Sequence, residues 1–459
     1  MEAELLIQNA RIVTETVDFL GWLAVRGEVI AALGPGLPPA CAAATVVDAG
    51  DKWLLPGAID THPHFFDPGA TWREDFLHGT RAAASGGFTT VLDMPNTSPP
   101  VRDEATFALK LARAQAASLV DFGLWGAALP DNQADLARLR ELGCVAFKAF
   151  TLEAAPDYPW SDEYDQWQEM ARLAQLGAVY GAHAEHSTLV RRFTQAHRAQ
   201  PWSLAVHDAS RPPQAELTAI NTLLLYAEMT GCRLHICHMS LPEGARLIAQ
   251  AKARGVDVTV ETCAHYLTLN YEDDGALGAF GMINPPLRSR ARMEQLWEFV
   301  LDGTIDYLGT DHAPYLKEEK LPPDGDARKA ACGAPEIDVA LPLLLEEGVK
   351  KRGMTLPRFA AFTAGNAARR FGLYPRKGAL APGADADFYL ADPDSPWTFS
   401  RRNSFSKSKA LGFAHEGRRM QCRIAATYLR GRPIYRDGEI LEAPGYGRFL
   451  RPQDMPAGR

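Results

Sequence analysis

Three features common in secreted and membrane proteins are missing from this chain of 459 residues. Its seven cysteines are odd in number and contain no Cys-x-x-Cys pair, which indicates reduced thiols in a cytoplasmic protein rather than a disulfide framework. The first residues, Met1-Glu-Ala-Glu-Leu-Leu-Ile7, have neither a basic segment nor a long apolar one, so we expect no secretory signal. No apolar run approaches the roughly 18 residues that a membrane helix needs, so we expect no membrane partner.

A concentration of charge of one sign is also missing. Acidic and basic residues are interspersed, and the formal net charge is −8. A protein that binds nucleic acid or an anionic membrane usually carries a basic patch, so neither partner is expected. The composition therefore favours a soluble enzyme that acts on a small molecule.

The two ends of the chain share a β-like pattern. Residues 1–52 contain short extended segments separated by turns, and the same style returns over residues 376–440. The residues between them, 53–375, follow a different pattern. We therefore predict one small β-sandwich domain assembled from both termini, with the middle inserted, and an irregular arm over residues 441–459.

The middle of the chain alternates short apolar segments with longer amphipathic ones. Eight such repeats over roughly 320 residues predict a (β/α)8 barrel, the TIM barrel of the α/β class. The alternative, an open doubly wound sheet, usually has a glycine-rich phosphate turn after its first strand, whereas here that strand ends in His62-Pro-His64. The predicted strands are Gly57–Asp60, Thr89–Met94, Asp121–Gly126, Cys144–Phe150, Ala178–His183, Arg233–His238, Asp257–Glu261 and Asp306–Thr310.

The first chemical signal is the pair His62 and His64 at the end of an apolar run. Alternate side chains of a strand share a face, so both imidazoles point to one side and suit a divalent transition metal. Two histidines near a turn are nevertheless more often merely solvated. Barrel active sites lie at the carboxyl ends of the strands, so the other strand ends test the metal hypothesis. Those ends supply four further candidate ligands, Lys148, His183, His238 and Asp311.

Lys148 lies in an otherwise apolar strand, Val145-Ala-Phe-Lys-Ala-Phe150. A lone lysine there usually extends its amine to solvent or pairs with an acid. A desolvated lysine amine, however, loses its proton readily, and the neutral amine can combine with carbon dioxide to form a carbamate. Because four histidines and an aspartate share the same rim, we favour the carbamate, which is able to bridge two metal ions. Cys237 and Cys263 have no evident basic partner and are interpreted as core residues.

Together these motifs resemble the amidohydrolase superfamily. They are most similar to its cyclic-amide hydrolases: dihydroorotase, allantoinase, and hydantoinase or dihydropyrimidinase. The resemblance covers nearly the whole chain, including the β-domain split between the termini. The segments that carry it are Asp60-Thr-His62-Pro-His64, Met94-Pro-Asn-Thr97, Phe147-Lys148, His183, His238, Glu261-Thr-Cys-Ala-His-Tyr-Leu267, Asn284-Pro-Pro-Leu-Arg288, Thr310-Asp311-His312 and Gly383-Ala-Asp-Ala-Asp387.

The resemblance implies a centre of two divalent metal ions, with Zn²⁺ expected. Two cations keep a hydroxide available near neutral pH and polarise the ring carbonyl that the hydroxide attacks. Asp311 would then carry the proton to the departing ring nitrogen. A homodimer or homotetramer is expected on the same grounds. The ligands implied are His62, His64 and Asp311 for a buried ion, His183 and His238 for a more exposed ion, and carboxylated Lys148 as the bridge.

Three positions concern the substrate carboxylate that dihydroorotases bind. Their arginine two residues after the second metal histidine is replaced by Phe66, and their histidine four residues after the aspartate is replaced by Tyr315. Only their asparagine survives, as Asn96. Hydrogen bonds to a charged group contribute about 1.5–3 kcal/mol each to the free energy of binding. The loss of the arginine and the histidine therefore disfavours dihydroorotase activity. The tyrosine that D-hydantoinases place five residues after the metal lysine is also replaced, by Glu153.

Several stretches, such as Ser210-Arg-Pro-Pro213, look most like allantoinase or L-hydantoinase. We therefore expect a neutral cyclic ureide as substrate, allantoin first and a hydantoin next, with dihydropyrimidinase or dihydroorotase activity as alternatives. Asn96 and Asn284 are expected to pair with ring amides. Phe66 and Tyr315 are candidate pocket walls, although ordinary packing explains each aromatic ring equally well. The irregular stretch 315–333 is a candidate lid over the rim.

Two other classes of protein stay open as alternatives. Dihydropyrimidinase-like scaffold proteins keep the fold but lose the metals, whereas this chain retains every ligand that the resemblance implies. A mononuclear deaminase of the same superfamily acts on an exocyclic amine and typically lacks the lysine found here at position 148. Lys148 is therefore the residue that separates a binuclear hydrolase from a deaminase.

Overall fold

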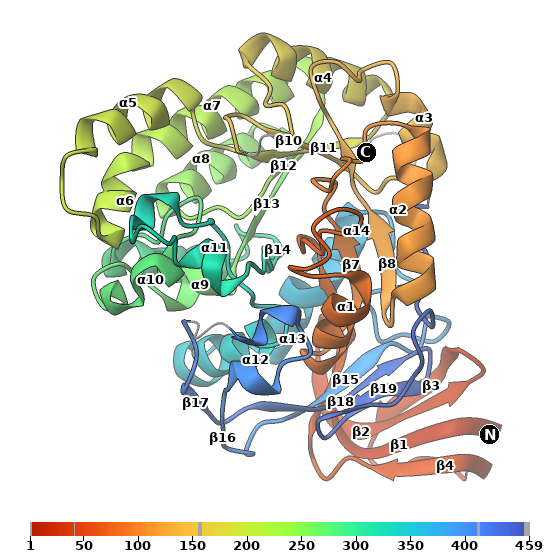
Figure 1. The fold of residues 1–459 in the computed structure, drawn as a ribbon. Helices are drawn as coiled ribbons and strands as arrows, with labels where there is room; N and C mark the ends of the chain where they lie inside the picture. The colour runs from red at the N-terminus through yellow and green to blue at the C-terminus, as the bar shows by residue number, and fades with distance from the viewer. Residues whose placement is uncertain (1, 41, 155–157, 411–413, 454–459) are drawn as a thin grey trace.

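The computed structural model describes residues 2–40, 42–154, 158–410 and 414–453. A barrel surrounded by helices sits beside a large β-sheet, in which red strands from the N-terminus lie next to blue strands from the C-terminal part (Figure 1). Within the described ranges no helix is long and apolar enough to cross a membrane. The barrel provides the strand ends on which a site can be built, and the sheet contacts the barrel, where the Thr427 hydroxyl donates to the Ala84 carbonyl at 2.7 Å.

Eight parallel strands form the barrel. Pairing runs through β6, β7 and β8, and then from β9 through β10, β11, β12 and β13 to β14. Only Trp125 separates β8 from β9, so these two elements count as one barrel strand. The ring closes where the His64 N–H donates to the His312 carbonyl at 2.9 Å. Each predicted strand overlaps one of these, so the predicted (β/α)8 fold is confirmed. The strands are β6 (Ala58–Asp60), β7 (Phe88–Asp93), β8 (Asp121–Leu124), β9 (Gly126–Ala127), β10 (Phe147–Phe150), β11 (Val179–His183), β12 (Arg233–Ile236), β13 (Val258–Thr262) and β14 (Tyr307–Leu308).

Helices cover the outside of the barrel, where each buries an apolar face. Asp162 caps helix α4, because its carboxylate accepts the N–H groups of Tyr164 and Asp165, and Leu173 of the helix is buried. The helices between barrel strands are α1 (Phe76–Ser85), α2 (Glu104–Ala117), α3 (Leu136–Leu142), α4 (Glu163–Gln175), α5 (Ser187–His197), α6 (Leu204–Ser210), α7 (Pro213–Thr230), α8 (Pro242–Ala253), α9 (Ala264–Thr268) and α10 (Arg290–Leu301), followed by α11 (Lys317–Lys320), α12 (Ala340–Leu344), α13 (Leu356–Ala360) and α14 (Asn366–Arg370).

Both ends of the chain contribute to one nine-stranded sheet, with the order β20-β19-β18-β15-β5-β1-β2-β3 and β4 beside β1. The N-terminal and C-terminal strands meet where β5 pairs antiparallel with β15. This pairing refines the predicted sandwich to a single continuous sheet drawn from both termini. The strands are β1 (Glu2–Val13), β2 (Asp18–Arg26), β3 (Val29–Pro35), β4 (Ala42–Asp48), β5 (Trp53–Pro56), β15 (Phe388–Asp392), β18 (Arg423–Leu429), β19 (Arg432–Arg436) and β20 (Glu439–Ile440).

The end of the described chain returns to the barrel. The Phe122 N–H donates to the Arg448 carbonyl at 3.0 Å, and the Leu450 N–H donates to the Phe122 carbonyl at 2.7 Å. These bonds place residues 448–450 alongside β8, and Leu450 is buried. Residues 454–459 of the predicted arm lie outside the described residues.

A buried lysine ties the barrel to the C-terminal segment. Lys377 is 1% exposed, and its ammonium lies 2.5 Å from Asp121 Oδ2, 2.8 Å from Asp385 Oδ2 and 2.6 Å from Asp387 Oδ2. Burial alone lowers the pKa of the Lys377 ammonium, but the three carboxylates more than reverse this, so the group stays charged. Because the ammonium already occupies the space between them, these aspartates are a structural ion cluster rather than a metal site.

Replacing this lysine tests the link. We expect Lys377→Met to lower the free energy of unfolding by about 3–5 kcal/mol, because removal of one partner leaves buried charge without compensation. Thermal unfolding followed by calorimetry measures the change. The exposed Lys351, which pairs with Glu347 one helical turn away, provides a matched control in Lys351→Met. Equal unfolding temperatures for the two variants would show that the cluster adds no net stability.

Candidate active site

Six polar side chains from different strand ends line one cavity at the carboxyl end of the barrel. The cavity has a volume of about 340 Å³. None of the six residues is more than 8% exposed, although buried polar groups are costly unless they are bonded or bind a ligand. They are the residues that the sequence predicts as metal ligands: His62 and His64 after β6, Lys148 in β10, His183 at the end of β11, His238 after β12 and Asp311 after β14.

Three of these side chains bring one donor atom each to a common point. Asp311 Oδ1 lies 3.1 Å from His64 Nε2 and 3.6 Å from His62 Nε2. All three donor atoms lie within 4.8 Å of one another. Two imidazole nitrogens and one carboxylate oxygen form a donor set that suits Zn²⁺ or a similar divalent ion.

The other two histidines form a second donor group. His183 Nδ1 and His238 Nε2 lie 3.1 Å apart, which is close enough for one ion to accept both nitrogens. Lys148 joins the first group, because its Nζ lies 3.4 Å from His62 Nε2. Among the described residues Lys148 forms no ion pair with a carboxylate, and its Nζ lies 5.2 Å from the centre of the Phe150 ring. A buried lysine without an acidic partner fits a modified or metal-associated amine better than a structural cation.

Oxygen acceptors behind the histidines determine which ring nitrogen faces the cavity. His62 Nδ1 contacts Glu261 Oε1, and His64 Nδ1 lies 2.8 Å from Asn96 Oδ1. His183 Nε2 lies 2.7 Å from Glu185 Oε2. Each bond places the ring proton on the nitrogen away from the cavity, so the other nitrogen keeps its lone pair for a metal ion. The donor set therefore has the orientation that a metal centre requires.

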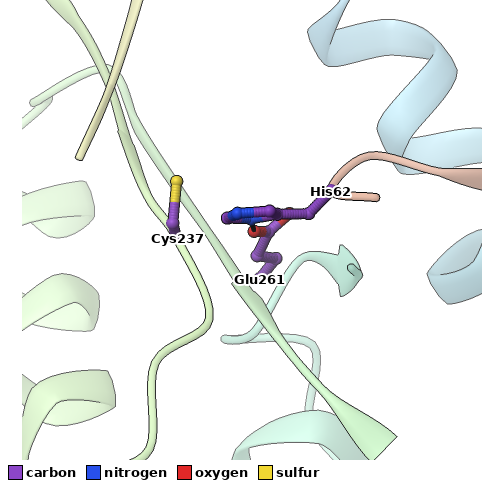
Figure 2. Close-up of side chains that lie close together, drawn as sticks. All are labelled: His62, Cys237 and Glu261. Carbon is purple, nitrogen blue, oxygen red and sulfur yellow. Dashed lines mark hydrogen bonds and ion pairs between the residues drawn. The ribbon is translucent and has the colours of Figure 1, made fainter. Parts of the chain in front are cut away.

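Figure 2 shows one of these supports in detail: the carboxylate of Glu261 lies against the His62 ring, and the thiol of Cys237 lies beyond the tip of the ring. The carboxylate is already committed, because it also accepts the Thr61 hydroxyl and lies 3.3 Å from His235 Nε2. Burial raises the pKa of the Cys237 thiol to about 12, so this thiol stays protonated at neutral pH. This trio therefore supports His62 and does not form a metal site of its own.

The protonation states also suit a metal. Burial lowers the pKa of His62 to about 4, and the nearby charge of Lys148 adds to the effect. Burial likewise lowers the pKa values of His183 and His238, so these rings are neutral at pH 7. Burial raises the pKa of Asp311, but the His64 hydrogen bond and nearby imidazoles outweigh it, and the net shift is downward. Neutral imidazoles and an ionised carboxylate are the forms that bind metal ions.

Backbone strain is concentrated at the same place. Phe66, His238 and Asp311 have φ values of +54°, +34° and +47°, in the left-handed region that non-glycine residues rarely adopt. Such conformations cost roughly 1–3 kcal/mol each and persist where surrounding structure enforces them, most often at functional sites. The strain therefore lies in the turns after the strands, which orient these side chains toward the cavity.

The four residues predicted to contact substrate, Asn96, Asn284, Phe66 and Tyr315, also line the cavity. The Phe66 and Tyr315 rings lie 5.6 Å apart between centroids. Asn284 Oδ1 is buried and has no hydrogen-bond partner in the described part of the chain. The segment 315–333 covers this side of the cavity, because Tyr315 and Cys332 both line it. Whether the segment moves as a lid stays a prediction.

Glu261, Glu185 and Arg211 support the site but were not among the residues predicted from the sequence. Glu185 is fully buried and bonds to His183 on one side and Arg211 on the other. The sequence does offer a way to find both acids. Glu261 lies at the end of a predicted strand, and Glu185 lies two residues after the predicted ligand His183. An acid at a barrel rim beside metal histidines is a candidate to orient them.

Comparison with known proteins agrees with this geometry. Residues 53–412 match the amidohydrolase family. The chain is 40% identical to the allantoinase of Rubrobacter xylanophilus, across 94% of this chain and 93% of that protein, and 38% identical to the allantoinase of Deinococcus radiodurans, across 99% and 100%. Among solved structures it is similar to the L-hydantoinase (dihydropyrimidinase) from Arthrobacter aurescens, with a TM-score of 0.94, 30% identity, and coverage of 98% of this chain and 100% of that one.

The bond from Glu261 to His62 can be tested by a near-isosteric change. Glu261→Gln keeps the shape but removes the charge that orients the ring, so we expect affinity for Zn²⁺ to fall by about 10–100-fold. Competition with a chromophoric chelator measures this affinity directly. Glu228, an exposed partner of Arg254, provides the matched control Glu228→Gln. Zn²⁺ affinity equal to that of the control would contradict the role assigned to Glu261.

Proposed function

Because the chain belongs to the amidohydrolase family, we propose that it is a metal-dependent hydrolase that opens the ring of a cyclic ureide by cleaving an amide C–N bond. The observation that carries the proposal is the convergence of four histidines, a lysine and an aspartate on one cavity. Relatives named allantoinase and a structural neighbour named L-hydantoinase support this reaction class. A non-catalytic scaffold needs none of these oriented ligands.

The proposed cofactors are two divalent metal ions, with Zn²⁺ the first candidate. When bound, they would make a water molecule acidic and polarise the carbonyl of the substrate. In the proposal Lys148 carries a carboxylate, formed when its neutral amine bonds to the carbon of CO2 and releases a proton. The absence of an acidic partner for Lys148 among the described residues supports this modification. The proposed ligands are His62, His64 and Asp311 for one ion, His183 and His238 for the other, and Lys148 for both.

Asp311 is the proposed proton carrier. Its carboxylate is ionised, lines the cavity and lies beside His64, so it is able to accept a proton from the attacking water. The oxygen of that water stays on the carbonyl carbon, which becomes a carboxyl group when the ring C–N bond breaks. Asp311 returns the proton to the departing nitrogen. The reaction thus consumes one water and leaves a ring-opened acid with a new N–H.

The proposed substrate is a neutral ring, with allantoin first and a hydantoin second. Phe66 and Tyr315 supply apolar wall where dihydroorotases carry polar carboxylate-binding groups, so dihydroorotate is disfavoured. Asn96 and the chain around Asn284 are proposed to hold the ring amides. Dihydropyrimidinase activity is the alternative function, and the likeness to a structure titled L-hydantoinase (dihydropyrimidinase) supports keeping it in the test.

A cytoplasmic homodimer or homotetramer is part of the proposal. Large apolar side chains are exposed on two helices that touch each other: Tyr164 on α4, and Leu225 and Met229 on α7, are 51–69% exposed, and the Trp167 and Tyr226 rings join the two helices. The assembly is proposed from the resemblance, and these side chains are the first candidates for its interface. The proposal includes no nucleic-acid or membrane partner.

Side-by-side turnover tests the proposed substrate class. Zinc-loaded protein is assayed for ring opening of allantoin, hydantoin, dihydrouracil and dihydroorotate. We expect the highest kcat/KM for allantoin and the lowest for dihydroorotate, because the cavity wall near Phe66 offers no group for a carboxylate. Removal of zinc by a chelator should abolish turnover, and added zinc should restore it. Preferential turnover of dihydroorotate, or turnover that survives complete metal removal, would overturn the proposal.

Lys148→Ala tests the bridging carbamate. We expect the variant to retain at most one zinc ion per chain and to lose activity, because the bridge between the two donor groups is gone. Metal analysis after dialysis provides the count, and Lys351→Ala is the matched control. Metal-free wild-type protein should also take up its second zinc ion only when bicarbonate is supplied. A fully active variant with two ions would refute the role of Lys148.

A further inference from the structure

Arg211 lines the cavity but has no role in the chemistry proposed above. It lies just after α6, and its side chain is 15% exposed. Two guanidinium nitrogens donate to Glu185, Nε to Oε1 at 3.0 Å and Nη2 to Oε2 at 2.6 Å. The remaining nitrogen, Nη1, forms no hydrogen bond with any residue that the structure describes. This N–H group is therefore available to a ligand in the cavity.

The main chain of Arg211 is held from outside the cavity. Arg288 Nη1 donates to the Arg211 carbonyl and to Asp208 Oδ1, both at 2.7 Å. Arg288 Nη2 also donates to Glu216 Oε2 at 2.8 Å, and Arg288 itself is buried. Arg211 is thus anchored at both its carbonyl and its guanidinium group. A donor positioned in this way loses little conformational entropy when it binds a ligand.

Asn284 contributes an acceptor to the same cavity. Its Oδ1 is buried and has no hydrogen-bond partner among the described residues, which is costly unless a ligand supplies a donor. Arg211, Asn284 and Cys332 all line this one cavity, which has a volume of about 340 Å³. The cavity therefore holds one unpaired donor and one unpaired acceptor among its described lining residues.

Resting on the proposed function, we infer that Arg211 and Asn284 form a subsite for a ureido substituent on the substrate ring. A ureido group, –NH–CO–NH2, carries a carbonyl acceptor and a terminal amide donor. The carbonyl would accept from Arg211 Nη1, and the terminal amide would donate to Asn284 Oδ1. A hydantoin without this substituent leaves both groups unpaired. The subsite therefore selects a ureido-substituted ring over the bare ring.

The charges on this wall favour a neutral substituent over a carboxylate. Glu185 is fully buried and pairs with Arg211 through two bonds, so the cation is already compensated. Asn284 Oδ1 presents a second partial negative charge, and the exposed Glu153 also lines the cavity. A carboxylate at this position would lie near Asn284 Oδ1 and Glu153, which both repel it. Its only donor would be Arg211, whose charge is already shared with Glu185. A neutral ureido group meets one donor and one acceptor, which match it.

The test compares allantoin, which carries the ureido substituent, with hydantoin, which lacks it. Both rings use the same metal centre, so the ratio of their kcat/KM values isolates the substituent. We expect Asn284→Leu and Arg211→Lys each to lower kcat/KM for allantoin by about tenfold or more, the cost of one lost hydrogen bond at a buried partner. Hydantoin kcat/KM should fall less than allantoin kcat/KM in Asn284→Leu, because the variant removes the side-chain amide and keeps the backbone around position 284 that is proposed to hold the ring amides. Asn221→Leu on exposed α7 and Arg102→Lys at the exposed Asp131 pair are matched controls.

Zinc content is measured for every variant, because Arg211 also contacts Glu185, which supports His183. If Arg211→Lys loses zinc, Asn284→Leu decides the outcome, since Asn284 contacts no proposed metal ligand. Equal losses on both substrates in Asn284→Leu, or unchanged allantoin turnover, would overturn the subsite alone. A wild-type protein that opens neither ring would instead contradict the proposed function, and the subsite with it.

Discussion

The bond between Glu261 and His62 is the interaction on which the cavity depends. The carboxylate is fully buried and also contacts the Thr61 hydroxyl, His235 Nε2 and the backbone N–H of His238. Burial raises the pKa of Glu261, but His62 and His235 more than offset it, so the group stays ionised. A single negative charge thereby links side chains from the ends of β6, β12 and β13. Without it, the rings would lose both their tautomer and their direction.

Two buried lysines at opposite ends of the barrel, Lys377 and Lys148, differ in their pairing with acids. At the end that faces the β-sheet, Lys377 and Arg430 are matched by Asp121 and its neighbours, and the charges compensate one another. At the other end, Lys148 has no acidic partner among the described residues, and His238 Nδ1 has no hydrogen bond there. Compensated charge stabilises a structure, whereas uncompensated polar groups are retained where a ligand completes them. Lys148 and His238 lie in the cavity where the six polar side chains converge, so this end of the barrel is the candidate working end.

The sequence was sufficient to predict the barrel and the six converging side chains. Alternation of apolar and amphipathic segments reveals strands and helices, and the carboxyl ends of parallel strands must meet. Strand boundaries were less accurate: the apolar run Cys144–Phe150 was predicted as one strand, whereas β10 begins at Phe147. The difference is one of regularity, because the Val145 N–H and the Ala146 carbonyl already bond to the neighbouring strand before β10 begins.

The supporting residues could not be predicted in the same way. Glu261 and His62 are 199 positions apart, and the bond between them exists only because the barrel closes. Asn96 illustrates a related limit: its residue type suggested a substrate contact, but the structure also shows its Oδ1 on His64. The pairing of Arg211 with Glu185 likewise depends on the loop between α6 and α7. Residue type and strand position predict which groups reach the cavity, whereas their partners follow from the tertiary structure.

The substitution at Phe66 has a clearer physical meaning in three dimensions. A cation does lie nearby, since the Arg73 guanidinium is 5.4 Å from the centre of the Phe66 ring and 4.8 Å from that of Tyr315. It is already committed, however, because its Nε donates to Glu319 at 2.8 Å, and Arg73 is not among the residues that line the cavity. The substrate would therefore meet two aromatic rings rather than a free guanidinium. A neutral ring can pack against such a wall, whereas a carboxylate would lose hydration there and gain no partner.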